Sequence, residues 1–159
     1  MIVPKVKAGG IIRNERLARI GVLSAPDRPG LASAVLHALA GKSINVQFIV
    51  QLVDPTDHSH VILCVAEDVA ETALQALQTV RDQIGAQTIT SQANVAIVSV
   101  FGPDFRERPA IAAAVFEALA SVGINIMAIS TSISTVSCLI DGSRVEDALI
   151  ALREHFDLP

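Results

Sequence analysis

The fold of this chain is decided by a stretch that occurs twice: AVLHALA at residues 34–40 returns as AVFEALA at residues 114–120. The tripeptide that follows each copy is also repeated, as Ile44-Asn45-Val46 and as Ile124-Asn125-Ile126. Self-similarity of this kind predicts two copies of one structural module. We therefore expect the function to depend on how two modules are used together.

The composition agrees with two small modules that are rich in interfaces. A module of about 75 residues buries only about 60% of the surface of its unfolded chain, so it gains stability by packing on another module or chain. Hydrophobic residues make up 51% of the sequence and the mean hydropathy is +0.51, which fits buried interfaces. No apolar run is long enough for a transmembrane helix. The first residues do not resemble a signal peptide, so we expect a cytoplasmic protein.

The charge and the aromatic content argue against nucleic acid as a partner. The formal net charge is −4, aromatic residues make up 3%, and the chain has no Trp and no Tyr. Nucleic-acid surfaces need clustered Lys and Arg together with stacking rings. Cys64 and Cys138 fall at matching places in apolar segments of the two copies. We expect both to be buried free thiols, because a disulfide is not expected in a cytoplasmic chain.

The first copy predicts the order strand, helix, strand, strand, helix, strand. The expected ranges are 17–23, 31–40, 46–53, 61–66, 68–84 and 88–90. Apolar residues at helical spacing, including Leu31, Val35 and Leu39, define the first helix. The polar loop 54–59 makes a hairpin of the two middle strands. This βαββαβ order is the split βαβ, or ferredoxin-like, unit, and it places the chain in the α+β class.

The second copy is one strand short of the first. Its expected elements are a strand at 95–101, a helix at 110–121, strands at 126–132 and 135–140, and a helix at 145–156. We expect the N-terminal segment 3–12 to return and complete this sheet, so that the first module is inserted within the second. The predicted domains are then residues 16–92, and residues 93–159 with the strand 3–12. The two termini would lie near each other.

The turn Asp27-Arg28-Pro29-Gly30 links a strand end to a helix start. The N-terminus of a helix offers unpaired N–H groups and the positive end of the helix dipole, which suit a small anion such as a carboxylate. Gly30 would let a ligand approach the backbone. The alternative interpretation is a capped turn with no ligand. In the second copy the turn is two residues longer and ends in Pro109-Ala110. Because Ala110 replaces the glycine, a ligand would approach the backbone less easily there.

Amide side chains gather in the segment that follows the first helix. Asn45, Gln47 and Gln51 share one face if the segment is a strand, and the second copy carries Asn125 and Thr131 at the corresponding places. Such a row indicates either an exposed face or a polar pocket. Amides and hydroxyls can hold the ammonium and carboxylate groups of an amino acid without performing chemistry.

Other polar clusters carry weaker signals. His58 and His60, with Asp54 and Asp57, could bind a metal, but a solvated hairpin loop is the better explanation without a further ligand cluster. No phosphate-binding loop, zinc spacing or Ser/His/Asp set occurs. We therefore expect no catalytic residue, no metal and no cofactor.

Taken together, these segments resemble the paired ACT domains of aspartokinase. The strongest markers are Pro26 to Ala32, Ile44 to Val46 and Ile49 to Gln51 in the first copy, and Val115 to Ala120, Gly123 to Ile126 and Ile129 to Ser132 in the second. The resemblance covers nearly the whole chain. It implies the regulatory half of the enzyme, or its separate β-subunit, and no catalytic activity by itself. It also implies homodimerisation through paired ACT sheets, a possible catalytic subunit as partner, and threonine or lysine as the ligand.

The resemblance also implies where the ligand lies, at an interface between modules and between chains. The implied residues are Asp27, Arg28, Pro29, Gly30, Leu31, Ala32, Asn45, Val46, Gln47 and Gln51 of the first module, with Asn125, Ile126 and Thr131 of the second. The family often has Asp where this chain has Gln47. Because the ε-ammonium of lysine is costly to desolvate without a charged partner, Gln47 favours threonine over lysine. Ala110, where the family tends to have Gly, weakens the case for a second site.

Two alternatives to an amino-acid sensor remain open at this point. One is a structural or dimerisation module that has lost ligand binding, which the Gln47 and Ala110 departures favour. The other is the regulatory subunit of a different enzyme of amino-acid biosynthesis, such as acetolactate synthase, against which the full second copy argues.

Overall fold

The computed structural model describes residues 4–159 and divides into two compact units. Unit 1 is Met1–Glu15 with Val95–Pro159, and unit 2 is Arg16–Asn94. Val3, the first residue of the predicted N-terminal strand, lies outside the described residues. Along the chain the elements are β1 (Val6–Lys7), β2 (Gly10–Pro26), α1 (Leu31–Ala40), β3 (Phe48–Val53), β4 (His58–Ala66), η1 (Glu67–Val69), α2 (Ala70–Ile84), β5 (Thr88–Phe101), η2 (Phe105–Glu107), α3 (Ala110–Ser121), β6 (Ala128–Thr131), β7 (Thr135–Asp141), η3 (Gly142–Arg144), α4 (Val145–His155) and β8 (Phe156–Asp157).

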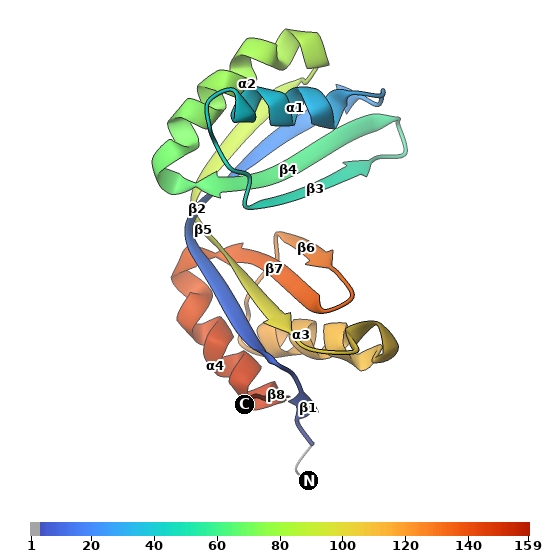
Figure 1. The fold of residues 1–159 in the computed structure, drawn as a ribbon, viewed down its shortest axis with the longest axis vertical. Helices are drawn as coiled ribbons and strands as arrows, with labels where there is room; N and C mark the ends of the chain where they lie inside the picture. Colours follow the sequence, from blue (N-terminus) through green and yellow to red (C-terminus); the bar gives the residue numbers. More distant parts are fainter. Residues whose placement is uncertain (1–3) are drawn as a thin grey trace. The chain divides into compact units, whose positions relative to one another are not determined.

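Unit 2 has the predicted βαββαβ order, with strands β3-β4-β2-β5 side by side. Helices α1 and α2 lie together over one face of this sheet (Figure 1). Alternation along each strand sends every second side chain to that face, and Ile20, Val22, Val61, Leu63 and Val65 meet the helices there. The result is one α layer on one β layer.

Unit 1 repeats the arrangement with strands β2-β5-β7-β6 and with helices α3 and α4 (Figure 1). Val98, Val100, Val136, Cys138 and Ile140 form the sheet side of its core. The predicted helix 110–121 is confirmed by α3. The N-terminal residues from Gly10 enter β2, and the Gly9 N–H donates to the Phe101 carbonyl at 2.7 Å. Both units are therefore ferredoxin-like, as the sequence predicts.

Two strands are longer than predicted. β5 joins the expected strands 88–90 and 95–101 into one, and β2 begins well before Leu17. Each long strand has a residue with a left-handed backbone close to the boundary between the units, Arg16 at φ 58 in β2 and Asn94 at φ 54 in β5. The polar stretch before Val95 has no apolar alternation, so pattern alone does not predict that the strand continues through it.

The last helix is shorter than predicted. It ends at His155, and Phe156 adopts an extended conformation with φ −113 and ψ 140. Phe156 and Asp157 instead pair in parallel with Val6 and Lys7 in a separate two-stranded sheet. Phe156 is buried in the core of unit 1, so its apolar character reflects strand packing and not a helix face.

Cys64 and Cys138 are buried free thiols, as predicted, but they are not equivalent positions. Phe48 pairs with Cys64 on β4, whereas Ala128 at the start of β6 pairs with Leu139. Cys138 therefore corresponds to Leu63, one residue away from Cys64. A one-residue shift places a side chain on the other face of a sheet, and only Cys138 belongs to a core that faces helices.

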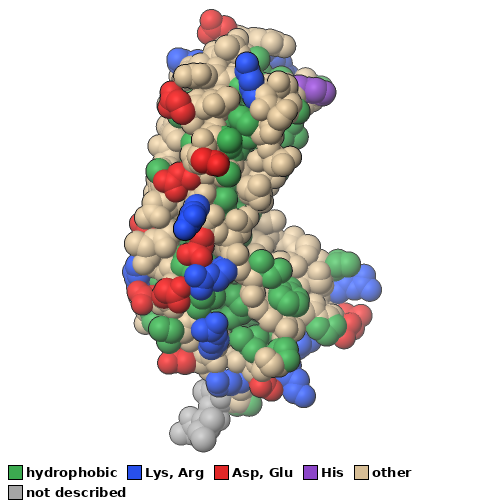
Figure 2. All heavy atoms as spheres, turned by 60° about the vertical axis from the view of Figure 1, so that its left-hand side comes forward, with side chains coloured by type: hydrophobic (Ala, Val, Ile, Leu, Met, Phe, Trp, Pro, Cys, Tyr) green, Lys and Arg blue, Asp and Glu red, His purple; other side chains and the backbone are tan. Residues whose placement is uncertain are grey.

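Apolar side chains remain exposed on the edge strands. Ile49, Leu52 and Val53 are exposed on β3, the edge strand of the unit 2 sheet, and Ile129 is exposed on β6, the edge strand of the unit 1 sheet. Figure 2 shows apolar side chains at the surface among charged ones on one face of the molecule. Within residues 4–159, no helix is long and apolar enough to cross a membrane.

Candidate functional site

The β2–α1 connection carries the predicted turn. β2 ends at Pro26, and its register against β4 shifts between Val22 and Ala25. Ser24 lies in this β-bulge with a left-handed φ of 55. Bulges redirect a strand end, and here the strand passes into the turn from Asp27 to Gly30.

Helix α1 begins without a side-chain cap. Gly30 is its N-cap, with φ 96 and ψ −5, and no side chain bonds to the first helical amides. The first backbone bond of the helix runs from the Ala34 N–H to the Gly30 carbonyl at 2.9 Å. Within the part of the chain that the structure describes, the amides of Leu31, Ala32 and Ser33 have no acceptor. Three N–H groups and the positive dipole end therefore remain available to an anion.

A polar relay fixes the carboxylate at the start of the turn. The Ser59 hydroxyl donates to Asp27 Oδ1 at 3.0 Å and accepts from Gln51 Nε2 at 3.4 Å. Ser59 is fully buried although it is polar, and its hydroxyl is satisfied by these two partners. Asp27 and Gln51 are themselves exposed. The relay thus brings together two predicted site residues that are distant in sequence, and Ser59, which the sequence places in a loop, is the residue that joins them.

The β3–β4 hairpin organises a second polar cluster around Asp54. Its Oδ1 accepts from the Thr56 N–H at 2.8 Å, the Thr56 hydroxyl at 2.7 Å and the His58 N–H at 3.1 Å. Its Oδ2 lies 2.8 Å from His60 Nε2. These bonds, the one from His60 foremost, hold the pKa of Asp54 well below its usual range. Within residues 4–159 no group of three or more His, Cys, Asp or Glu is arranged to hold a metal.

A shallow pocket of about 430 Å³ lies where α1 begins and α2 ends. It is lined by Arg28, Pro29, Gly30, Leu31, Ala34, Gln83 and Ile84. The structure therefore brings four predicted site residues to one pocket. The Arg28 guanidinium donates to the Gln83 carbonyl at the end of α2, so this contact directs its charge toward α2, whereas Asp27 is held by Ser59 of β4.

The three predicted amides do not share a strand face. β3 begins only at Phe48, so Asn45, Val46 and Gln47 belong to the irregular segment before it, and only Gln51 lies within the strand. The prediction assumed a strand from Val46 and was wrong in this detail. The chain leaves α1 through a tight turn in which the Ile44 N–H donates to the Leu39 carbonyl at 3.1 Å, and the pairing with β4 is regular only from Phe48 onward.

The corresponding turn of unit 1 is built differently. Its extra residues form η2, which buries Phe105 in the unit 1 core. The N-cap of α3 is Pro109 with a helical backbone, and the Ile111 N–H donates to the Arg108 carbonyl at 3.1 Å. Asn125 and Ile126 precede β6, and Thr131 is its last, exposed residue. The predicted site residues of the second module therefore lie after α3 in the chain, and not in the turn that precedes α3.

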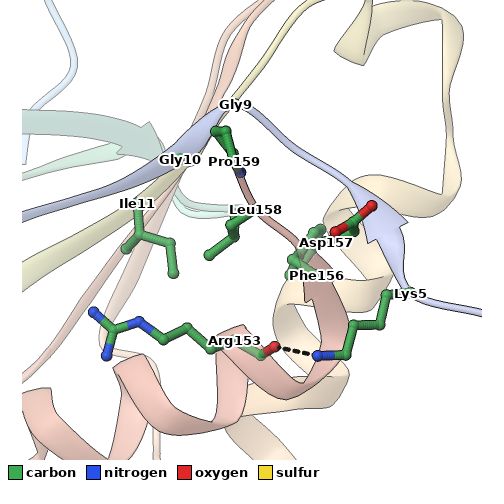
Figure 3. Close-up of a pocket in the computed structure, with 9 residues that line it drawn as sticks. All are labelled: Lys5, Gly9, Gly10, Ile11, Arg153, Phe156, Asp157, Leu158 and Pro159. Atoms are coloured by element: carbon green, nitrogen blue, oxygen red, sulfur yellow. Dashed lines mark hydrogen bonds between the residues drawn. The ribbon is translucent and has the colours of Figure 1, made fainter.

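A further pocket, of about 460 Å³, lies in unit 1 beside the N-terminal strand (Figure 3). Its lining residues are Lys5, Gly9, Gly10, Ile11, Arg153, Phe156, Asp157, Leu158 and Pro159. Lys5 Nζ donates to the Arg153 carbonyl at 2.9 Å (Figure 3), where a cation suits the C-terminal end of α4. None of the predicted site residues lines this pocket.

Comparison with known proteins identifies the repeated module. Residues 18–82 match the ACT domain family, and residues 98–156 match an ACT domain family again. A regulatory subunit of aspartate kinase from Thermus thermophilus, solved in a ligand-free form, has a TM-score of 0.86 and 34% identity, over 94% of this chain and 99% of that one. A crystal structure of aspartokinase alpha and beta subunits contains a chain with a TM-score of 0.85 and 35% identity, over 93% and 97% of the two chains.

These similarities show that the chain is a pair of ACT domains of the regulatory type. The chain belongs to the family of aspartate kinase regulatory subunits. An aspartokinase from Thermus thermophilus is 38% identical over 143 residues, which are 89% of this chain and 35% of that protein. The chain therefore spans about a third of the length of the curated relatives that it matches.

Proposed function

We propose that this chain senses a free amino acid and transmits its presence to an aspartate kinase catalytic region as feedback inhibition. The observation that carries the proposal is the pairing of an uncapped helix start with a fixed carboxylate. The α1 amides of Leu31 to Ser33 suit the ligand's carboxylate, and the Asp27 carboxylate suits its ammonium group. A zwitterionic α-amino acid presents these two charges close together, so one small molecule satisfies both ends of the turn.

The remaining predicted residues complete this site in the proposal. Gly30 has open space in front of it, since an added Cβ would meet nothing within 4 Å, and Gln51 offers its amide oxygen beside Asp27. Asn45 and Val46 follow α1 in the chain, and we propose that they contact the ligand from that side. Asn125, Ile126 and Thr131 of the second ACT domain enter from a second copy of the chain, so the proposed site lies between domains and between chains.

The ligand that we favour is threonine, with lysine as the weaker candidate. Gln47 is neutral, and no acidic residue occurs between Ile44 and Val53. A lysine ε-ammonium placed over this segment would lose water without gaining a charged partner, which costs free energy. A threonine hydroxyl needs only a neutral donor or acceptor, and an amide supplies both.

A homodimer is part of the same proposal. β3 and β6 are edge strands with exposed apolar side chains, and an uncovered edge of this kind is usually paired or shielded. A second copy of the chain offers a matching edge, because closed two-fold pairing uses the same surface twice. The first domain, 16–92, and the second, 93–159 with 3–12, then each contribute to the assembly. A cytoplasmic location remains a prediction from the sequence.

A thermal-shift series against the twenty amino acids tests the proposal. A ligand at 100 times its dissociation constant adds about 2.7 kcal/mol to the free energy of unfolding. A shift with threonine alone supports the sensor and its selectivity. A shift with lysine alone keeps the sensor and refutes the argument from Gln47. No shift with any amino acid refutes the sensor and favours a structural ACT module that has lost ligand binding.

A further inference from the structure

The hairpin between β3 and β4 holds both ends of the segment that leads to the Asp27 turn. At one end, the Ser24 N–H donates to His60 Nδ1 at 3.2 Å. At the other end, the Asp27 N–H donates to the Asp57 carbonyl at 3.1 Å. We call the hairpin residues Asp54, Thr56, Asp57 and His60 the hairpin clamp. The hairpin clamp accepts hydrogen bonds from the backbone N–H groups of Ser24 and Asp27, which flank Ala25 and Pro26 at the end of β2.

The hydrogen bonds fix the tautomer of His60. A backbone N–H is always a donor, so Nδ1 must accept from Ser24 and cannot carry a proton. The ring proton therefore lies on Nε2, which donates to Asp54 Oδ2 at 2.8 Å. Only the neutral imidazole with its proton on Nε2 satisfies Ser24 and Asp54 together, since a second ring proton would face the Ser24 N–H.

Asp54 passes this restraint to the other end of the segment. Its Oδ1 holds the turn through Thr56 and His58, and the Asp57 N–H donates to the Asp54 carbonyl at 3.1 Å. Asp57 has a left-handed φ of 60, and its own carbonyl accepts from the Asp27 N–H. A continuous series of hydrogen bonds therefore links Ser24, through His60 and Asp54, to the hairpin turn, and Asp57 of that turn accepts from Asp27.

We propose that the hairpin clamp positions the Asp27 carboxylate for the ligand's ammonium group, and that His60 is its positioning residue. This inference rests on the proposed amino-acid site. The bulge at Ser24 has a left-handed backbone that a serine adopts only at a cost, and the bond to His60 Nδ1 compensates for it. Releasing Ser24 lets the bulge relax, and Asp27, only three residues away, moves with it.

Two substitutions separate the two bonds of His60. In His60→Asn the amide oxygen replaces Nδ1 and keeps the acceptor for Ser24, but the side chain is too short to reach Asp54. In His60→Gln the amide nitrogen replaces Nε2 and keeps the bond to Asp54, but Ser24 loses its acceptor. His37→Gln is the matched control, because His37 is exposed on α1 and its hydrogen bonds run to Ser33 within its own helix.

The first readout is nuclear magnetic resonance of the whole chain without ligand. We expect the imidazole nitrogen shifts of His60 to report a neutral ring protonated at Nε2, and the Ser24 amide to exchange slowly with solvent. His60→Gln should speed the exchange of the Ser24 and Asp27 amides at least tenfold, whereas His60→Asn should protect Ser24. A ring protonated at Nδ1, or unchanged exchange in His60→Gln, would overturn the clamp.

The second readout is calorimetric titration with threonine, well below the melting temperature of every variant. His60→Gln should raise the dissociation constant at least tenfold, and His37→Gln should leave it unchanged. Binding of equal strength in His60→Gln would overturn the positioning role while the proposed function stood. If the unsubstituted chain bound no amino acid, the proposed function would fail and the positioning role with it, and the exchange rates of Ser24 and Asp27 would still decide whether the clamp exists.

Discussion

Replacing Gly30 by alanine separates the conformational cost of the turn from its role in binding. Gly30 has φ 96, a region that a residue with a Cβ enters at a cost of about 1–2 kcal/mol. A Cβ at Gly30 would meet nothing within 4 Å, so no steric clash adds to that cost. We therefore expect Gly30→Ala to lower the free energy of unfolding by about 1–2 kcal/mol, equivalent to a fall in Tm of about 2–8 °C for a chain of this size.

Gly123 supplies the matched control for this substitution. It follows α3 in unit 1, has φ 70, and also has open space, since an added Cβ would meet nothing within 4 Å. Gly123→Ala should therefore cost a similar free energy of unfolding. Only Gly30→Ala places its methyl group where the proposed ligand carboxylate approaches the backbone, so only this variant should also raise the dissociation constant for threonine, by roughly tenfold or more.

Urea unfolding gives the stability of each variant, and calorimetric titration gives its affinity. Equal binding by the two alanine variants would refute the placement of the ligand at the start of α1. A Gly30→Ala protein as stable as the unsubstituted chain would refute the conformational argument itself, since the left-handed backbone would then carry no cost.

Three further expectations follow from buried or hydrogen-bonded groups. Ser59→Ala removes the donor to Asp27, and should lower the free energy of unfolding by about 1 kcal/mol and weaken threonine binding; urea unfolding and titration test this, and an unchanged affinity would contradict the relay. The pKa of Asp54 is lowered in the folded state, so its contribution to stability is present above the ordinary Asp pKa of about 3.9 and is lost as the pH falls through the folded value. Urea unfolding between about pH 6 and about pH 2.5 should therefore show an acid loss that is smaller in Asp54→Asn, and equal losses would contradict the assignment. Burial raises the pKa of Cys64 and of Cys138 to about 12, so at about pH 8 both thiols should resist alkylation in the native chain and react only in urea; rapid native labelling, followed by mass spectrometry, would show that a thiol is accessible.

The repeat and the helical spacing were enough to predict the architecture. Apolar positions such as Leu31, Val35 and Leu39 face a core in the structure, because the burial of one helix face leaves a clear period in the sequence. The turn from Asp27 to Gly30 could also be predicted, since Pro and Gly at a strand end indicate a helix start.

The relay and the hairpin clamp could not be predicted in the same way. Ser59 and His60 alternate between the two faces of β4. Ser59 contacts Gln51 of β3 and Asp27 after β2, whereas His60 contacts Ser24 of β2 and Asp54 of the hairpin turn. These contacts depend on a strand register that the sequence does not encode locally. The same limit explains the error over Cys64 and Cys138. Similar spacing in two copies does not reveal a one-residue shift, and that shift decides which face of the sheet each thiol occupies.

Calorimetric titration of the purified chain with threonine tests the central claim most directly. The account predicts saturable binding of one threonine per chain, because unit 2 has the Asp27 relay and a glycine N-cap, whereas in unit 1 Pro109 is the N-cap of α3 and the Ile111 N–H donates to the Arg108 carbonyl. The binding should be abolished in Asp27→Ala. Two equal sites per chain would contradict the difference between the units, and the absence of binding by threonine and by every other amino acid would contradict the sensor itself.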